Sequence, residues 1–175
     1  MKTYLLPLLA LLALAQCKKK ADPDPVDQLP SATQTGANTF GCLVNGQAWT
    51  PKGSDGTSNY SIAYDVGYRQ GTLNISTYRY ANSDANSKQL IIIYSDSLKT
   101  IGNYPLVSDG RREALFKDRA TGCEFFGGPY YRRGNLTITR LDLQAGIISG
   151  TFAFTLYKPG CDSVRVTQGR FDKRL

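Results

Sequence analysis

The feature that most constrains the fold is an alternation of apolar and polar residues, interrupted by turn-forming residues. Beyond about residue 36, Gly, Asn, Asp and Pro recur roughly every eight to twelve positions. Successive side chains of a β-strand point to opposite faces, so this alternation is typical of strands with one buried face. No long segment of the sequence shows the 3.6-residue period of an amphipathic helix. The sequence therefore predicts an all-β domain, a single antiparallel β-sandwich or barrel of about eight to ten strands.

Two hairpins are the clearest units of this domain. Near the C-terminus, residues 135–139 and 148–157 flank a turn at residues 144–146. Near the start of the domain, Asn45-Gly46 separates two apolar runs. This pair favours a type I′ turn, which needs positive φ at both positions, and a two-residue turn there places Cys42 opposite Trp49.

The remaining strands are predicted from shorter patterns. Residues 62–68 and 73–77 alternate and are expected to be neighbours, whereas residues 90–94 are apolar on both faces and predict a central strand covered on two sides. Residues 109–119 fit either a short helix or a strand, and we favour the strand. The last strand changes phase between Val166 and Phe171, which predicts a bulge at Gly169.

The N-terminus has the pattern of a lipoprotein signal peptide. Lys2 precedes an apolar stretch of about a dozen residues, fewer than the roughly 20 that span a bilayer. The stretch ends on Leu14-Ala15-Gln16-Cys17, which resembles the lipobox of bacterial lipoproteins, although Gln16 departs from the usual Gly or Ala. We predict that residues 1–16 are removed and that Cys17 carries the lipid. The alternatives are an ordinary secretory signal with a chance cysteine, or a buried apolar helix.

The segment after Cys17 is predicted to be a flexible linker over residues 17–35. It contains three lysines, Lys18 to Lys20, and is rich in proline, a composition that buries too little apolar surface to order itself. Next to acyl chains, each lysine would contribute about 1 kcal/mol at an anionic membrane surface. The remaining 140 residues, 36–175, are enough for one domain.

Composition excludes several classes of function. The whole chain has a net charge of +7, but without Lys2 and Lys18 to Lys20 it has 17 basic against 14 acidic residues, so we expect no nucleic-acid partner. The chain has no histidine, which excludes Ser-His-Asp, Cys-His and histidine-zinc chemistry. Residues 82–87 resemble the opening of a calcium loop but lack its glycine and distal glutamate. We therefore expect neither a metal nor a cofactor.

Three cysteines remain after Cys17 in what would be an oxidising compartment, so at most one intrachain disulfide can form among them. Cys161 follows the end of the C-terminal hairpin by four residues, and Cys123 precedes that same end with enough chain to reach it. The sequence thus predicts a Cys123–Cys161 disulfide, with Cys42 left as a buried thiol. Pairings that involve Cys42 stay open.

The chain resembles a family of small bacterial lipoproteins of unknown function. The resemblance rests on residues 39–49, on residues 102–106 and on the stretch from residues 150–154 through 169–172. It implies an envelope location and an all-β domain. It carries over no catalytic residues.

The strongest candidate ligand site in the sequence is the run Tyr130, Tyr131, Arg132 and Arg133, with Tyr78-Arg79-Tyr80 elsewhere. Aromatic faces next to fixed positive charge suit sugars, peptidoglycan carboxylates or an acidic protein surface. The plainer interpretation is that tyrosine favours strands and that arginine faces solvent.

Catalysis without histidine would need two carboxylates with separated pKa values. The available carboxylates lie at predicted turns or outward positions: Asp65, Asp96, Asp118, Glu124, Asp142 and Asp162. We therefore predict a non-enzymatic lipoprotein of the bacterial envelope, anchored to the outer membrane and facing the periplasm or the surface, that binds a glycan or an envelope protein. The alternatives are a carboxylate-based hydrolase acting on envelope glycans, and a purely structural, shielding lipoprotein.

Overall fold

The computed structural model describes residues 22–107 and 110–175. The predicted signal peptide and Cys17 lie outside the described residues. Within the described ranges, no helix has the length and apolar character needed to cross a membrane.

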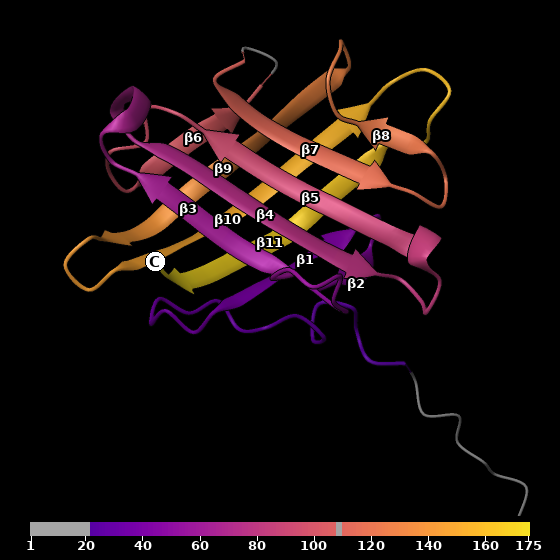
Figure 1. The fold of residues 1–175 in the computed structure, drawn as a ribbon, viewed down its shortest axis with the longest axis horizontal. Helices are drawn as coiled ribbons and strands as arrows, with labels where there is room; N and C mark the ends of the chain where they lie inside the picture. Colours follow the sequence, from indigo (N-terminus) through magenta and orange to yellow (C-terminus); the bar gives the residue numbers. More distant parts are fainter. Residues whose placement is uncertain (1–21, 108–109) are drawn as a thin grey trace, which may run out of the picture.

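The domain is built from two antiparallel sheets packed face to face (Figure 1). The six-stranded sheet has the spatial order β2 (Gln47–Trp49), β1 (Thr39–Val44), β11 (Val164–Arg174), β10 (Ile147–Tyr157), β9 (Tyr131–Asp142) and β6 (Gly102–Leu106). The five-stranded sheet has the order β3 (Tyr60–Asp65), β4 (Thr72–Tyr80), β5 (Lys88–Ser95), β7 (Arg112–Asp118) and β8 (Cys123–Phe125). The predicted all-β fold is confirmed as a sandwich, and the described residues form eleven strands where about eight to ten were expected.

Alternation along the strands fills the space between the sheets. On β10, Phe152, Phe154 and Leu156 are buried, while Thr151, Ala153 and Tyr157 are exposed. The five-stranded sheet contributes fully buried side chains such as Ile75 and Ile93. Both predicted hairpins are confirmed: β9 pairs with β10, and Cys42 pairs with Trp49 across the Asn45-Gly46 turn. Residues 109–119 hold the strand β7, as favoured over a helix.

The position of β5 is central, as predicted, but only one of its faces is covered. Ile91 and Ile93 are fully buried, whereas Leu90, Ile92 and Tyr94 are half-buried on the outer face of the sheet. The prediction of cover on both faces is wrong because the sandwich has two layers, and none of the residues that the structure describes forms a third layer on this sheet. Cross-strand neighbours shield the outer face in part.

The predicted extra residue in the last strand is present. Phe152 faces Gly169 and Phe154 faces Val166, so β11 has one residue more than β10 over this stretch. The bulged residue is Gln168, with φ 54°, rather than Gly169. Gly169 is still required, because a Cβ there would lie 2.4 Å from the ring of Phe152.

Cys123 and Cys161 form a disulfide with their Cα atoms 5.8 Å apart. The bond joins β8 of the five-stranded sheet to the β10–β11 connection of the other sheet. Cys42 is a buried free thiol beside Trp49, and its burial raises its pKa to about 12. The predicted arrangement of the three cysteines is the one found.

The predicted linker, residues 17–35, differs from the structure over its last part. Leu29 is buried, and residues 33–37 lie against β11, where the carboxylate of Asp172 binds them. This carboxylate is 1% exposed and accepts backbone hydrogen bonds from Thr35, Gly36 and Ala37 of 2.8–3.0 Å. A buried carboxylate needs such hydrogen-bond donors. The composition of the segment did not indicate that it would bind Asp172, a residue more than 130 positions away.

Candidate functional site

The structure divides the four predicted ligand-binding residues between two faces. Arg132 is 9% exposed, and its Nε donates to the carbonyl of Ala114 at 2.9 Å. Its guanidinium also lies 3.8 Å from Glu113 and donates to the hydroxyl of Tyr130, which itself donates to the carbonyl of Phe125 at 2.8 Å. Arg132 and Tyr130 therefore hold strands together. They also line a depression of about 430 Å³ beside Glu113, on a different face from Tyr131 and Arg133. Their role in ligand binding stays a prediction.

Tyr131 and Arg133 lie on the opposite, outer face of the six-stranded sheet. Tyr131 is directly across from Tyr157 on β10, and each of these rings is 51% exposed. In the next row, Thr155 on β10 lies between Arg133 on β9 and Arg165 on β11. Because adjacent strands are about 4.8 Å apart, the two arginines stand about 10 Å apart, on either side of the central strand.

Polar residues continue this face along the same strands. Asn135 faces Ala153 in the third row, and Thr151 lies between Thr137 and Arg170 in the fourth. We call the whole set the tyrosine–arginine face. Its residues are Tyr131, Arg133, Asn135, Thr137, Thr151, Ala153, Thr155, Tyr157, Arg165 and Arg170.

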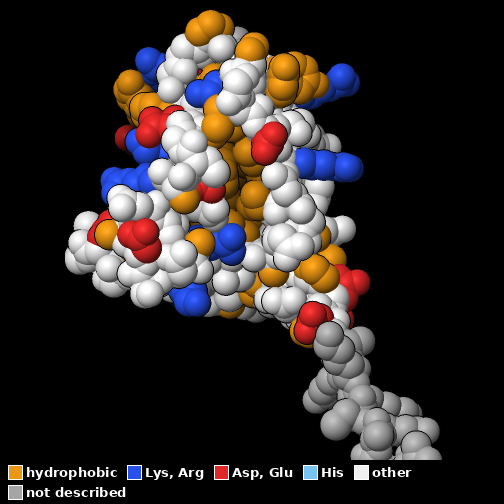
Figure 2. Space-filling model, turned by 90° about the vertical axis from the view of Figure 1, so that its right-hand side faces the viewer, with side chains coloured by type: hydrophobic (Ala, Val, Ile, Leu, Met, Phe, Trp, Pro, Cys, Tyr) orange, Lys and Arg blue, Asp and Glu red, His pale blue; other side chains and the backbone are white. Residues whose placement is uncertain are grey.

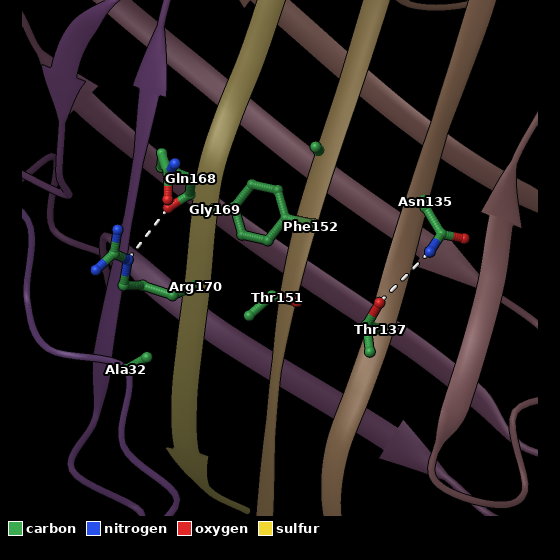
Figure 3. Close-up of a pocket in the computed structure, with 9 residues that line it drawn as sticks. Ala32, Asn135, Thr137, Thr151, Phe152, Gln168, Gly169 and Arg170 are labelled. Carbon is green, nitrogen blue, oxygen red and sulfur yellow. Dashed lines mark hydrogen bonds between the residues drawn. The ribbon is translucent and has the colours of Figure 1, made fainter. Parts of the chain in front are cut away.

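The centre of the tyrosine–arginine face is hollowed. Two depressions of about 480 and 360 Å³ adjoin there and share Asn135 and Ala153. Figure 3 shows the larger one, with Asn135 and Thr137 of β9 on one side, Gln168 and Arg170 of β11 on the other, and β10 between them. The outward residue at the floor, Ala153, is small, and the backbone of Gly134 and Gly169 also lines the two depressions. These glycines pair with the inward residues Phe154 and Phe152. A Cβ on either glycine would come within 2.5 Å of a neighbouring strand.

Two features fix Arg170 at the edge of this hollow. Its Nε donates to the carbonyl of Gln168, the bulged residue, at 3.2 Å, and its Nη1 donates to the carbonyl of Pro30 at 3.5 Å. Ala32 also lines the hollow. The bulge and the docked N-terminal segment therefore build one side of the site.

The charge of the tyrosine–arginine face is entirely positive, since its charged members are three arginines. The two acidic residues of β9, β10 and β11 do not offset it. Asp142 is paired with Arg140 at 2.8 Å near the other end of β9, and Asp172 is buried. The face therefore favours anions.

Several of the carboxylates considered for catalysis form ion pairs or hydrogen bonds that stabilise the fold. Asp96 is buried, 3.4 Å from Arg111 and 3.8 Å from Arg69. Glu124 pairs with Lys117, and Asp65 accepts hydrogen bonds from two backbone amides of the turn after β3.

The remaining candidates for a metal site are also accounted for by the fold. In the calcium-like loop, Asn82 and Asp84 each accept a 2.8 Å hydrogen bond from a backbone amide of the loop itself, as a polar turn does. Across residues 22–107 and 110–175, no group of three His, Cys, Asp or Glu side chains is placed to hold a metal ion.

Comparisons with protein-family models, curated proteins and solved structures found no match to this chain. The resemblance to small bacterial lipoproteins stays a prediction. Sequence reasoning missed Tyr157, Arg165 and Arg170 as members of the site. The predicted C-terminal hairpin contained the signal for Tyr157, because a turn at residues 144–146 places it opposite Tyr131.

Proposed function

We propose that the protein is a membrane-anchored lipoprotein of the cell envelope that binds an anionic glycan, without catalysis, on its tyrosine–arginine face. The membrane anchor rests on the predicted signal peptide and on lipidation of Cys17. The binding function rests on one observation: two exposed tyrosines lie next to a row that carries two arginines, on a hollowed polar surface whose one further charge is Arg170.

The chemistry of each row suits a different part of such a ligand. Tyr131 and Tyr157 offer ring faces of low polarity with a polar tip, which suit the faces of sugar rings. Arg133 and Arg165 offer planar, permanently charged forks that match carboxylates or phosphates in two-bond geometry. The threonine and asparagine side chains of the next rows can both donate to and accept from sugar hydroxyls.

The dimensions of the face favour an extended ligand. Thr151 and Tyr157 are six positions apart on β10, which at about 3.3 Å per residue makes the face about 20 Å long. The start of β9 and the end of β10, which carry the tyrosine row, lie at the top of Figure 1, and the N-terminal segment leaves the domain at the bottom. The tyrosine row therefore lies at the end of the domain opposite the described part of the N-terminal segment.

A hydrolase acting on glycans would need two carboxylates in its cleft. The tyrosine–arginine face contains none, which supports binding rather than hydrolysis at this surface.

The proposal is tested by isothermal titration calorimetry of the chain with galacturonate oligomers, which are carboxylated, and with neutral maltose oligomers. We expect the carboxylated oligomers to bind, and their affinity to fall as salt is raised. Replacement Arg133→Ala or Arg165→Ala should weaken binding about ten- to hundredfold, since a charged hydrogen bond contributes about 1.5–3 kcal/mol.

The matched control is Arg119→Ala, which removes the same charge from an exposed turn after β7. This control should bind as the wild type does. Equal binding by all three variants, equal binding of neutral and carboxylated oligomers, or no binding of the carboxylated oligomers would contradict the proposal.

A further inference from the structure

A separate hollow of about 270 Å³ opens between the two sheets at one end of the sandwich. Figure 2 looks into the molecule from this side and shows hydrophobic side chains at the base of a cleft between two walls. Val44 and Val164 of the six-stranded sheet and Phe116 of the five-stranded sheet are its apolar lining. The hollow is smaller than the 480 Å³ depression of the tyrosine–arginine face, so it suits a small ligand.

One wall of the hollow holds a fixed guanidinium. Arg79 of β4 is half-buried; its Nε donates to Oε1 of Gln89 at 2.8 Å, and its Nη1 donates to the carbonyl of Ala48 at 2.9 Å. The indole of Trp49 lies 5.5 Å from the guanidinium and donates to the same Gln89 oxygen at 3.0 Å. Within the described part of the chain, Nη2 of Arg79 has no hydrogen-bond partner. The guanidinium of Arg79 is therefore held in place, and its Nη2 keeps N–H donors available for a ligand.

The facing wall holds a free carboxylate. Asp162 lies in the connection between β10 and β11, next to the Cys123–Cys161 disulfide that holds this rim to β8. Its side chain is exposed and forms no hydrogen bond or ion pair with any described residue. A second carboxylate, Asp118, lies on the Arg79 wall and is held by Gln89 at 2.8 Å.

We propose that this hollow binds a small zwitterion with an apolar substituent, such as an α-amino acid. The ligand carboxylate pairs with Arg79, its ammonium group pairs with Asp162, and its side chain packs against Phe116, Val44 and Val164. A simple anion would leave Asp162 unpaired, and a simple cation would leave the free donors of Arg79 unused. A ligand with both charges satisfies both walls. This site is distinct from the tyrosine–arginine face and does not depend on its function.

The test is calorimetry of the full chain with three probes: L-leucine, L-methionine and L-phenylalanine. Leucine is then compared with isoamylamine, which lacks its carboxylate, and with isocaproate, which lacks its ammonium group. We expect at least one of the amino acids to bind, and, with leucine, each single-charge analogue to bind at least tenfold more weakly. Replacement Asp162→Asn should weaken binding of the amino acid about tenfold, and because Asp162 is exposed, this variant keeps its fold.

The matched control is Asp27→Asn, an exposed carboxylate far from the hollow in the chain, which should bind as the wild type does. Arg133→Ala should also leave amino-acid binding unchanged, which separates this test from that of the glycan site. The proposal is overturned if none of the three amino acids binds, if both leucine analogues bind as tightly as leucine, or if Asp162→Asn has no effect.

Discussion

Ser149 donates a 2.7 Å hydrogen bond from its hydroxyl to the carboxylate of Asp172 in the buried part of the six-stranded sheet. The same carboxylate receives the hydroxyl of Thr33 at 2.7 Å and backbone amides from residues 35–37. Burial alone would raise the pKa of Asp172, but the hydrogen bonds from Ala37, Thr33 and Ser149 outweigh it and hold the pKa well below its usual range. One carboxylate therefore fastens the N-terminal segment to the last strand.

Replacement Asp172→Asn should lower the free energy of unfolding by about 2–3 kcal/mol, because buried donors lose a charged acceptor. Chemical denaturation at pH 7 measures the change, and Asp27→Asn is the exposed control.

The stability of the wild type should also depend on pH through Asp172. The pKa of this carboxyl is lower in the folded chain than the usual value of about 4, so the ionised group stabilises the fold fully only above about pH 4. The free energy of unfolding should therefore fall as the pH drops below that value towards the pKa of the folded state. The variant should lose less over the same interval, and an equal loss in both proteins would exclude this role for Asp172.

Gly150 is expected to tolerate no side chain. A Cβ at this position would lie 2.3 Å from the carbonyl oxygen of Thr137 and within 2.9 Å of the ring of Phe171. Gly150→Ala should therefore cost about 1–3 kcal/mol of unfolding free energy. The control is Gly67→Ala, where the nearest atom would be 3.5 Å away, and thermal unfolding should show it within about 0.5 kcal/mol of the wild type.

The cysteines should behave as one disulfide and one inert thiol. Non-reducing peptide mapping should recover Cys123 with Cys161, and replacing both by Ser should cost about 4 kcal/mol in the chain-entropy treatment of a 38-residue loop. Native Cys42 should resist alkylation at pH 8, because burial raises its pKa to about 12, and should react once the chain is unfolded. A crosslink that contains Cys42 as the main species would contradict this pairing.

Replacement Cys17→Ser should remove the lipid anchor. The variant is expected as an uncleaved or soluble form, in place of a detergent-extracted protein whose processing is sensitive to globomycin. Membrane fractionation with mass spectrometry of the N-terminus checks this. A Cys17→Ser variant that is cleaved and still partitions with membranes would refute lipidation as the anchor.

Much of the fold could be predicted from local patterns. The alternation along β10 and the Asn45-Gly46 turn each indicate a strand and its pairing register from only a few neighbouring residues. Both hairpins and the Cys42–Trp49 pair could therefore be predicted. The partial exposure of the outer face of β5 could not be predicted from the sequence. An apolar run shows that both faces of a strand can be buried, but it does not show how many layers pack on the sheet.

The candidate site could be predicted only in part, because it joins strands that are distant in the sequence. The alternation of β9 already separates Tyr131 and Arg133 from Tyr130 and Arg132. The neighbours Arg165 and Arg170 needed the pairing of β10 with β11, including the bulge at Gln168. The role of Asp172 depends on donors more than 130 positions away, and no local pattern indicates it.

An amide NMR titration of the chain with galacturonate oligomers shows whether an anionic glycan lies along the tyrosine–arginine face. Shift changes should concentrate on the outward residues of β9, β10 and β11, around Arg133, Thr155 and Arg165, and Arg133→Ala should reduce them. Changes confined to the five-stranded sheet, or no changes at concentrations well above those of the protein, would contradict it.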